Sequence, residues 1–273
     1  KLTAQYDTKQ HSTHVTISMG ISLLVIVTVT GDNGSNNSLG NRGIDSMEAH
    51  GLSKKELEHV FKFEGFGNKA GPLWFLGIEE GGGSIEQLRI RAKSFDLVED
   101  IRSVERIGYD VIDRHVPTWH IMSKLILAMR GNPDWQEKSR AQEYQNTELG
   151  RIDGDTFLTE LMPLPCPNIK AWPYESICPT KEAYTAMVRP GRIRWLRSEI
   201  VQFKPRAVIC YGKGNWPYHK EIFSDVKFED ELDGKIQIGR DGRTTILLIP
   251  FLSPDLVKTA MIPEIAKLIE FQP

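Results

Sequence analysis

Apolar residues along this chain fall into two alternating patterns from Ser53 onward. Short apolar runs bounded by glycine or proline predict buried β-strands; they span residues 72–78, 156–162, 206–211, 235–238 and 244–250. Longer segments with apolar residues at helical spacing predict α-helices; they start at Ser53 and span residues 84–93, 118–129, 180–203 and 262–271. Strands alternating with helices predict an α/β fold, a three-layer α/β/α sandwich with a mostly parallel central sheet.

Local residue types set the limits of these elements. Ser53 and Glu56 have the spacing of a capping box, which predicts the start of the first helix. Pro190–Gly191 predicts an interruption of the helix in 180–203, and Asp241–Gly242 predicts a hairpin turn. The polar stretch 131–155 predicts a long surface loop.

The first 46 residues differ in composition from the rest. Residues 31–46 are a Gly/Asn/Ser tract that cannot bury enough apolar surface to fold. The apolar run 20–30 is shorter than the roughly 20 residues of a membrane span. It would be a signal-peptide core if translation began at Met19, but a basic flank and a small-residue cleavage site are missing. We therefore predict residues 1–46 as a disordered leader outside the native protein, a native start at Met47, and one domain over 47–273.

Composition narrows the functional classes. Hydrophobic residues make up 40% and charged residues 26%, which is typical of a globular domain. A net charge of -2 argues against a generally basic nucleic-acid binder, although it allows a local basic groove. Three cysteines without a CxxC pair favour a reducing compartment. We expect a cytoplasmic monomer that does not enter membranes.

Chemistry in parallel sheets lies beyond the carboxyl ends of the strands, so the loops after the predicted strands are the candidates. The first of them contains Gly77, Glu79, Glu80 and Gly81. Glycines let a ligand approach the backbone, and the adjacent carboxylates can hold a water molecule. The alternative interpretation is a glycine-rich turn with solvated glutamates, since short motifs of this kind are weak evidence.

Five segments, taken in order, resemble the uracil-DNA glycosylase superfamily. In its first motif Gly77 and Gly81 match, Glu79 stands at the water-positioning place, and Glu80 replaces a proline. The segment 114–126 resembles the family's N-R-F-W element, whose aromatic residue stacks on the flipped base. There Trp119 aligns with the tryptophan, and threonine stands where the stacking phenylalanine would be.

The segment 157–168 resembles the T-N-x-x-x-C-x-P-P pattern of the iron–sulfur glycosylase families. Thr159 and Cys166 keep their places, Glu160 replaces the asparagine, and Cys178 resembles the next cysteine of the pattern. A cubane cluster needs four thiolates and the N-terminal CxxC is missing, so we predict no cofactor and no metal. These cysteines are then expected to be small buried hydrophobes.

The last two segments are the helix, Lys-Pro and strand over 203–213, which is structural scaffolding, and the closing loop 249–254. In that loop Ser253 and the following proline match the family's H-P-S-P. Phe251 takes the place of the histidine that stabilises the departing base. Loss of one such donor lowers a rate by about 100- to 1000-fold.

The resemblance implies an enzyme that flips a damaged or modified base, such as uracil, out of DNA and hydrolyses its N-glycosidic bond with a water molecule and no metal. The expected catalytic residues are Glu79 and Glu80, and the expected substrate-binding residues are Gly77, Gly81, Trp119, Glu160, Phe251 and Ser253. The partner is then a nucleic acid, most simply DNA, or a nucleotide. Two alternatives stay open: an inactive module of the same fold that binds nucleic acid, nucleotide or protein, and a hydrolase of small nucleosides.

Overall fold

The computed structural model describes residues 13–19, 23–29, 52–110, 114–168 and 170–269. The chain divides into two compact units, residues 1–46 and 47–273. In the first unit, β1 (Thr13–Met19) and β2 (Leu23–Val29) form an antiparallel hairpin. We predicted a disordered leader there, without strands; the Gly/Asn/Ser tract and Met47 lie outside the described residues.

The second unit is built on an eight-stranded sheet with the order β5-β3-β6-β4-β7-β10-β9-β8. Its four central strands are parallel: β6 (Thr156–Cys166), β4 (Leu73–Gly81), β7 (Ala207–Tyr211) and β10 (Thr244–Ile249). The flanking strands are short: β3 (Gly65–Gly67), β5 (Val98–Glu99), β9 (Ile236–Asp241) and β8 (Glu229–Glu231). Antiparallel pairs join β3 to β6, β10 to β9 and β9 to β8, whereas the outer pair of β3 and β5 is parallel, so the sheet is mixed outside its centre.

Alternation along the central strands creates two hydrophobic cores. In β7, Ala207, Ile209 and Tyr211 face one core, whereas Val208 and Cys210 face the other. Both faces are apolar because helices cover both of them, which is the usual reason for continuous apolar runs in parallel strands. The α/β class is thus confirmed, and the arrangement is compatible with the predicted three-layer sandwich.

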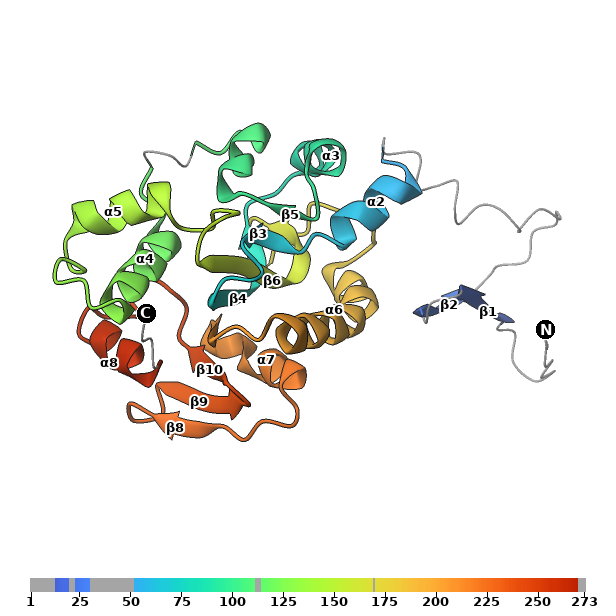
Figure 1. Ribbon diagram of the computed structural model, residues 1–273. Helices are drawn as coiled ribbons and strands as arrows, with labels where there is room; N and C mark the ends of the chain where they lie inside the picture. The colour runs from blue at the N-terminus through green and yellow to red at the C-terminus, as the bar shows by residue number, and fades with distance from the viewer. Residues whose placement is uncertain (1–12, 20–22, 30–51, 111–113, 169, 270–273) are drawn as a thin grey trace. The chain divides into compact units, whose positions relative to one another are not determined.

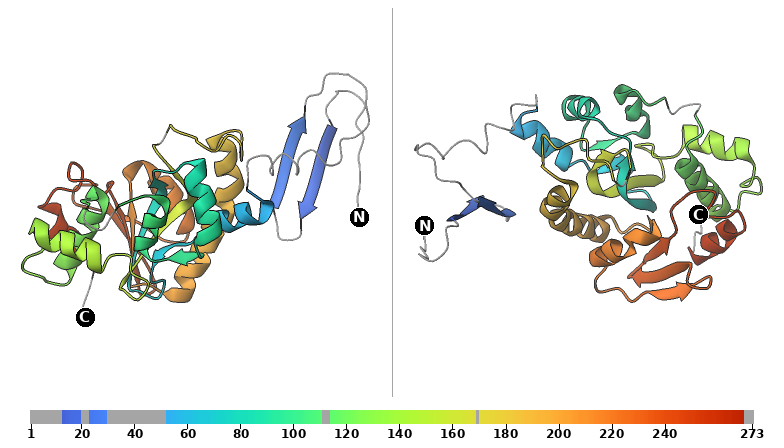
Figure 2. Two further views of the ribbon diagram at one scale, coloured as in Figure 1. Left: turned by 90° about the horizontal axis from the view of Figure 1, so that it is seen from above. Right: turned by 180° about the vertical axis from the view of Figure 1, so that it is seen from behind.

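Each core has its own helices (Figure 1). The first core includes residues of η1 (Ile101–Ile107), α4 (Pro117–Met129), α5 (Lys138–Thr147) and α8 (Met261–Leu268). The second includes residues of α2 (Lys54–Phe61), α3 (Ile85–Ser94), α6 (Lys181–Phe203) and α7 (Trp216–Ile222). A short 3-10 turn, η2 (Lys213–Asn215), precedes α7. Figure 2 shows the helices on both sides of the sheet from two further directions.

Two local predictions, the capping box and the hairpin, are confirmed. Ser53 caps α2 in a reciprocal capping box with Glu56. The β9–β10 hairpin forms as predicted, with its turn at Gly242 and Arg243, directly after Asp241, and Gly242 adopts a φ of 57°. In the described part of the chain, no helix combines the length and apolar character needed to span a bilayer.

Two local predictions are wrong. Residues 138–147 form α5 inside the predicted loop, held by the buried side chains of Ala141 and Tyr144. Helix α6 runs unbroken through Pro190, although proline removes one backbone hydrogen bond from the helix interior. Packing explains its continuity, because Arg192, Leu196 and Ile200 bury one stripe of this helix.

Candidate functional site

The parallel centre of the sheet brings distant loops together. Strands β6, β4, β7 and β10 are neighbours and run in one direction, so their carboxyl ends meet at one edge. The glycine-rich loop after β4 and the Ser-Pro loop after β10 therefore follow strands that end at the same side of the sheet. This confirms the prediction that the candidate loops share one edge.

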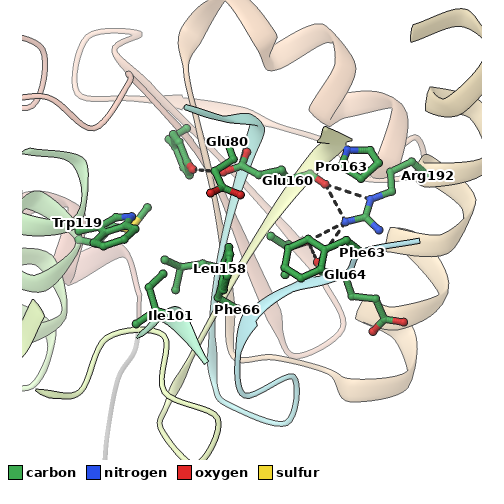
Figure 3. Close-up of a pocket in the computed structure, with 14 residues that line it drawn as sticks. Phe63, Glu64, Phe66, Glu80, Ile101, Trp119, Leu158, Glu160, Pro163 and Arg192 are labelled. Atoms are coloured by element: carbon green, nitrogen blue, oxygen red, sulfur yellow. Dashed lines mark hydrogen bonds between the residues drawn. The ribbon is translucent and has the colours of Figure 1, made fainter. Parts of the chain in front are cut away.

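A cavity of about 50 Å³ lies beside this edge, between the sheet and α4 (Figure 3). Most of its wall is apolar, and a few polar groups converge on it, as is usual for a small-molecule site. Its polar lining residues are Glu64, Glu80, Thr159, Glu160, Arg192 and Tyr211. Its apolar and aromatic lining includes Phe63, Phe66, Ile101, Trp119, Met122, Leu158 and Pro163.

Glu160 supplies the most unusual group of the cavity. Its Oε1 accepts a 2.8 Å hydrogen bond from the Tyr211 hydroxyl. Its Oε2 is buried and has no hydrogen-bond partner among the described residues. Burial, together with the nearby Glu80 and Glu79, raises the pKa of Glu160 to about 8 against the lowering effect of the Tyr211 hydrogen bond. At neutral pH this carboxyl therefore keeps its proton, and the Tyr211 bond to Oε1 leaves that proton on Oε2.

Arg192 fixes the backbone that carries Glu160. Its Nε and Nη2 both donate to the Glu160 carbonyl oxygen at 3.1 Å, and Nη2 also lies 3.2 Å from the Glu64 carbonyl oxygen. The guanidinium is stacked over the Trp195 ring at 3.9 Å, and its burial lowers the pKa of Arg192 to about 10. Arg192 thus joins α6 to β6 at Glu160, the residue that carries the unpartnered carboxyl oxygen.

Glu80 lies beside Glu160 in the cavity and has a different environment (Figure 3). Its Oε1 accepts a 2.6 Å hydrogen bond from Arg91 Nη2, which makes it a charge-assisted pair. The Arg91 guanidinium lies between aromatic rings, 5.1 Å from the centroid of Phe95. Its Nε and Nη1 are buried without a partner in the described part of the chain. They border a second cavity of about 10 Å³, roughly the room of one water molecule.

Glu79 does not line the cavity. Its carboxylate pairs with Lys181 Nζ at 2.7 Å and adjoins the Cys166 thiol, on the α6 side of the sheet. The pairing register between β4 and β6 shifts between Glu79 and Gly81. Strict alternation from Gly77 would have placed Glu79 on the cavity face, and the irregularity gives that place to Glu80 instead. Bulges next to binding sites commonly redirect side chains in this way.

The other predicted site residues are divided between the cavity and its surroundings. Trp119 lines the cavity, and Gly77 lies under it, because a Cβ at Gly77 would collide with Glu160 Oε2 and approach the Tyr211 hydroxyl to 2.5 Å. Phe251 is 46% exposed, with its ring 6.0 Å from that of Tyr211. Gly81 and Ser253 are not among the cavity-lining residues.

Three functional candidates escaped the sequence analysis. Tyr211 was taken only as the end of a buried strand. Arg192 is 6% exposed and continues the buried stripe of Leu196 and Ile200. Arg91 likewise follows Leu88 by three residues on the buried face of α3. An arginine in an apolar stripe at helical spacing was the available signal in both helices.

Metal and thiol chemistry have little support in the described residues. Nowhere in the described ranges do three or more His, Cys, Asp or Glu side chains gather where they could hold a metal ion. Cys166, Cys178 and Cys210 are free and buried, as expected for small hydrophobes. Burial raises the pKa of the Cys166 thiol to about 11, so it stays protonated near neutral pH.

The geometry offers a pair of carboxyl groups with opposite tasks in one apolar cavity. Glu160 presents a proton, while Glu80, paired with Arg91, presents a negative charge. Neighbouring titratable groups whose environments separate their protonation states are the usual arrangement for an acid and a base. A scan of known protein-family models finds none that matches this chain, and a search of curated proteins finds no match either.

Proposed function

We propose that this domain is an N-glycosylase that releases a base extruded from nucleic acid by hydrolysis of its N-glycosidic bond. The observation that carries the proposal is the buried, unpartnered Oε2 of Glu160, a carboxyl with a pKa of about 8 beside the ion-paired Glu80. The ordered resemblance of five segments to the uracil-DNA glycosylase superfamily, described above, supports it independently. The uracil-DNA glycosylase-like fold is part of this proposal.

In the proposed reaction, Glu80 accepts a proton from a water molecule whose oxygen attacks C1′ of the sugar. The C1′–N bond breaks, and its electron pair passes to the departing base. Glu160 Oε2 donates its proton to the base as the negative charge develops. The same oxygen offers the hydrogen-bond donor that is missing at Phe251, where the family has a histidine. General acid–base groups of this kind contribute about 100- to 10,000-fold to a rate.

The cavity walls suit a planar, apolar ring. Phe66 and Trp119 provide aromatic surface on which a flipped base can stack. Gly77 leaves the space in which the Glu160 carboxyl and the Tyr211 hydroxyl meet. Under this proposal Gly77 acts by leaving room for the acid, and it does not contact the substrate.

The test is a base-release assay on single- and double-stranded oligonucleotides that carry uracil, hypoxanthine or a thymine mismatch. Abasic product is detected by alkaline strand cleavage. We expect Glu80→Gln and Glu160→Gln to lower the single-turnover rate about 100-fold or more. The wild-type rate should fall above a pH of about 8, where Glu160 loses its proton.

The neighbouring Glu79→Gln variant is the matched control. It removes the same chemical group one residue away, on the face where Lys181 is its partner, so we expect near wild-type activity. Loss of activity in Glu79→Gln equal to that in Glu80→Gln would place the chemistry on the other face of the sheet. Absence of abasic product with every substrate would overturn the proposal, and tight binding of an oligonucleotide in that case would support the inactive binding module.

A further inference from the structure

The N-terminal end of helix α4 adjoins the cavity through Trp119, and it lacks a side-chain cap. Val116 is the N-cap residue and Pro117 follows at the first helical position. Backbone N–H groups in the first turn of a helix have no partner within the helix. Among the described residues, no bond satisfies the N–H groups of Thr118 and Trp119, whereas Val116 N–H donates to Gln145 Oε1 at 3.3 Å. Two donors and the positive end of a 13-residue helix therefore remain available.

His120 adds a buried polar group at the same end of α4. It is only 5% exposed, and its Nδ1 has no hydrogen-bond partner in the described part of the chain. Side chains on a helix lean toward its N-terminus, and the His120 ring contacts the ring of His115, which precedes the N-cap. The ring centroids lie 4.5 Å apart. The two histidines are therefore in contact, although Pro117 lies between them in the sequence.

Among the described residues, the charged groups that act on His120 are cations. Burial, together with the nearby His115, Lys124 and Lys138, lowers the pKa of His120 to about 4. Lys124 follows His120 by one helical turn, and Lys138 is the first residue of α5. A metal ion is therefore disfavoured here, because it would add positive charge to a cationic surrounding. An anion would find charge, backbone donors and an imidazole donor together.

We propose that His115, Thr118, Trp119 and His120 form a phosphate-binding site, the α4 phosphate site. Backbone N–H groups of Thr118 and Trp119 and the imidazole of His120 donate to the phosphate oxygens, and Lys124 and Lys138 supply charge. The ligand is a phosphate of the nucleic acid whose base enters the cavity, since Trp119 belongs to both the α4 phosphate site and the cavity wall. This link to the cavity rests on the proposed function, whereas phosphate binding itself does not.

The first experiment titrates the full chain with inorganic phosphate and follows the imidazole resonances of His115 and His120 by NMR. Sodium chloride at matched ionic strength is the reference. We expect a saturable shift of both resonances with phosphate only. No saturable shift, or an equal response to chloride, would overturn the site.

Variants separate the α4 phosphate site from general charge. His115→Asn and Lys138→Gln change exposed side chains, and together they should weaken phosphate binding about tenfold. His120→Asn should do the same, provided that circular dichroism confirms its fold. Lys227→Gln is the control, because its side chain is 88% exposed near β8, and it should leave the affinity unchanged. Equal losses in the control and in the His115/Lys138 variant would contradict the site.

A second arm tests the origin of the phosphate. Inorganic phosphate should compete with a short single-stranded oligonucleotide for the wild-type protein, and Glu160→Gln should retain phosphate binding. Phosphate binding without any base release would support the α4 phosphate site and remove only the glycosylase proposal. Oligonucleotide binding that phosphate cannot displace, and that the His115/Lys138 variant does not weaken, would overturn the assignment of the site to nucleic acid.

Discussion

Replacing Glu160 with glutamine should stabilise the fold at neutral and higher pH, although it removes a proposed catalytic group. The unfolded chain releases the Glu160 proton near the ordinary pKa of 4.5, and the folded protein holds it until a pH of about 8. Between these values the folded state binds one more proton than the unfolded state. The free energy of unfolding then falls by about 1.4 kcal/mol for each pH unit of increase.

Over the whole interval between the two pKa values, the free energy of unfolding falls by at most about 5 kcal/mol. This value is an upper limit, because part of the Glu160 side chain borders the cavity and is not fully desolvated. The contribution of Glu160 to the free energy of unfolding is fully present below its pKa in the unfolded chain. It is lost as the pH rises through its pKa in the folded protein. Glutamine keeps an oxygen for the Tyr211 hydroxyl and cannot ionise. The advantage of Glu160→Gln should therefore be under about 1 kcal/mol near pH 5 and should grow to about 4 kcal/mol near pH 8.

Urea unfolding of the wild type and of Glu160→Gln, from about pH 5 to about pH 8, measures this difference. Groups common to both proteins cancel, so the change with pH belongs to Glu160. Glu79→Gln removes a carboxylate that has an ion-pair partner and should show no growing advantage. A constant loss of stability in Glu160→Gln at every pH would mean that Glu160 is ionised in the fold, and its proposed role as an acid would then be refuted.

Three further variants test the site and its support. Gly77→Ala should lower the free energy of unfolding, measured in urea, by about 1–3 kcal/mol, because the added Cβ meets the Glu160 carboxyl. Gly81→Ala should leave it unchanged, because an added Cβ there has nothing within 4 Å. Equal effects of the two variants would contradict the packing. Arg91→Met should slow single-turnover base release about 10- to 100-fold because Glu80 loses its partner, and an unchanged rate would remove Arg91 from the site. Burial lowers the pKa of His219 from 6.5 to about 4. The free energy of unfolding should therefore fall by about 3 kcal/mol as the pH falls through this range, and His219→Gln should remove this pH dependence.

The strand core was predictable because its apolar runs are long and bounded by glycine or proline. The same patterns located the edge at which the loops meet, and hence the neighbourhood of Glu80 and Glu160. Helix α5 was missed because it buries few residues, chiefly Ala141 and Tyr144, which gives a weak periodic pattern. Helix propensity alone also failed at Pro190, where tertiary packing of Arg192 keeps the helix intact.

The choice between the two adjacent glutamates could not be made from the sequence. Alternation and motif alignment both assign the cavity face to Glu79, but a local shift in strand pairing turns Glu80 inward. Such a shift depends on how β4 pairs with β6, which residue spacing in one strand does not encode. The unpartnered oxygen of Glu160 was equally hidden, since it results from contacts between β4, β6 and β7.

The outermost strands of the sheet, β5 and β8, span two and three residues. A longer border would expose a row of backbone donors and acceptors onto which a strand of another molecule could add. The border strand β8 also consists of three acidic residues, Glu229, Asp230 and Glu231, which repel a second copy of themselves. The sheet is therefore protected at its margins against growth by strand addition into larger aggregates.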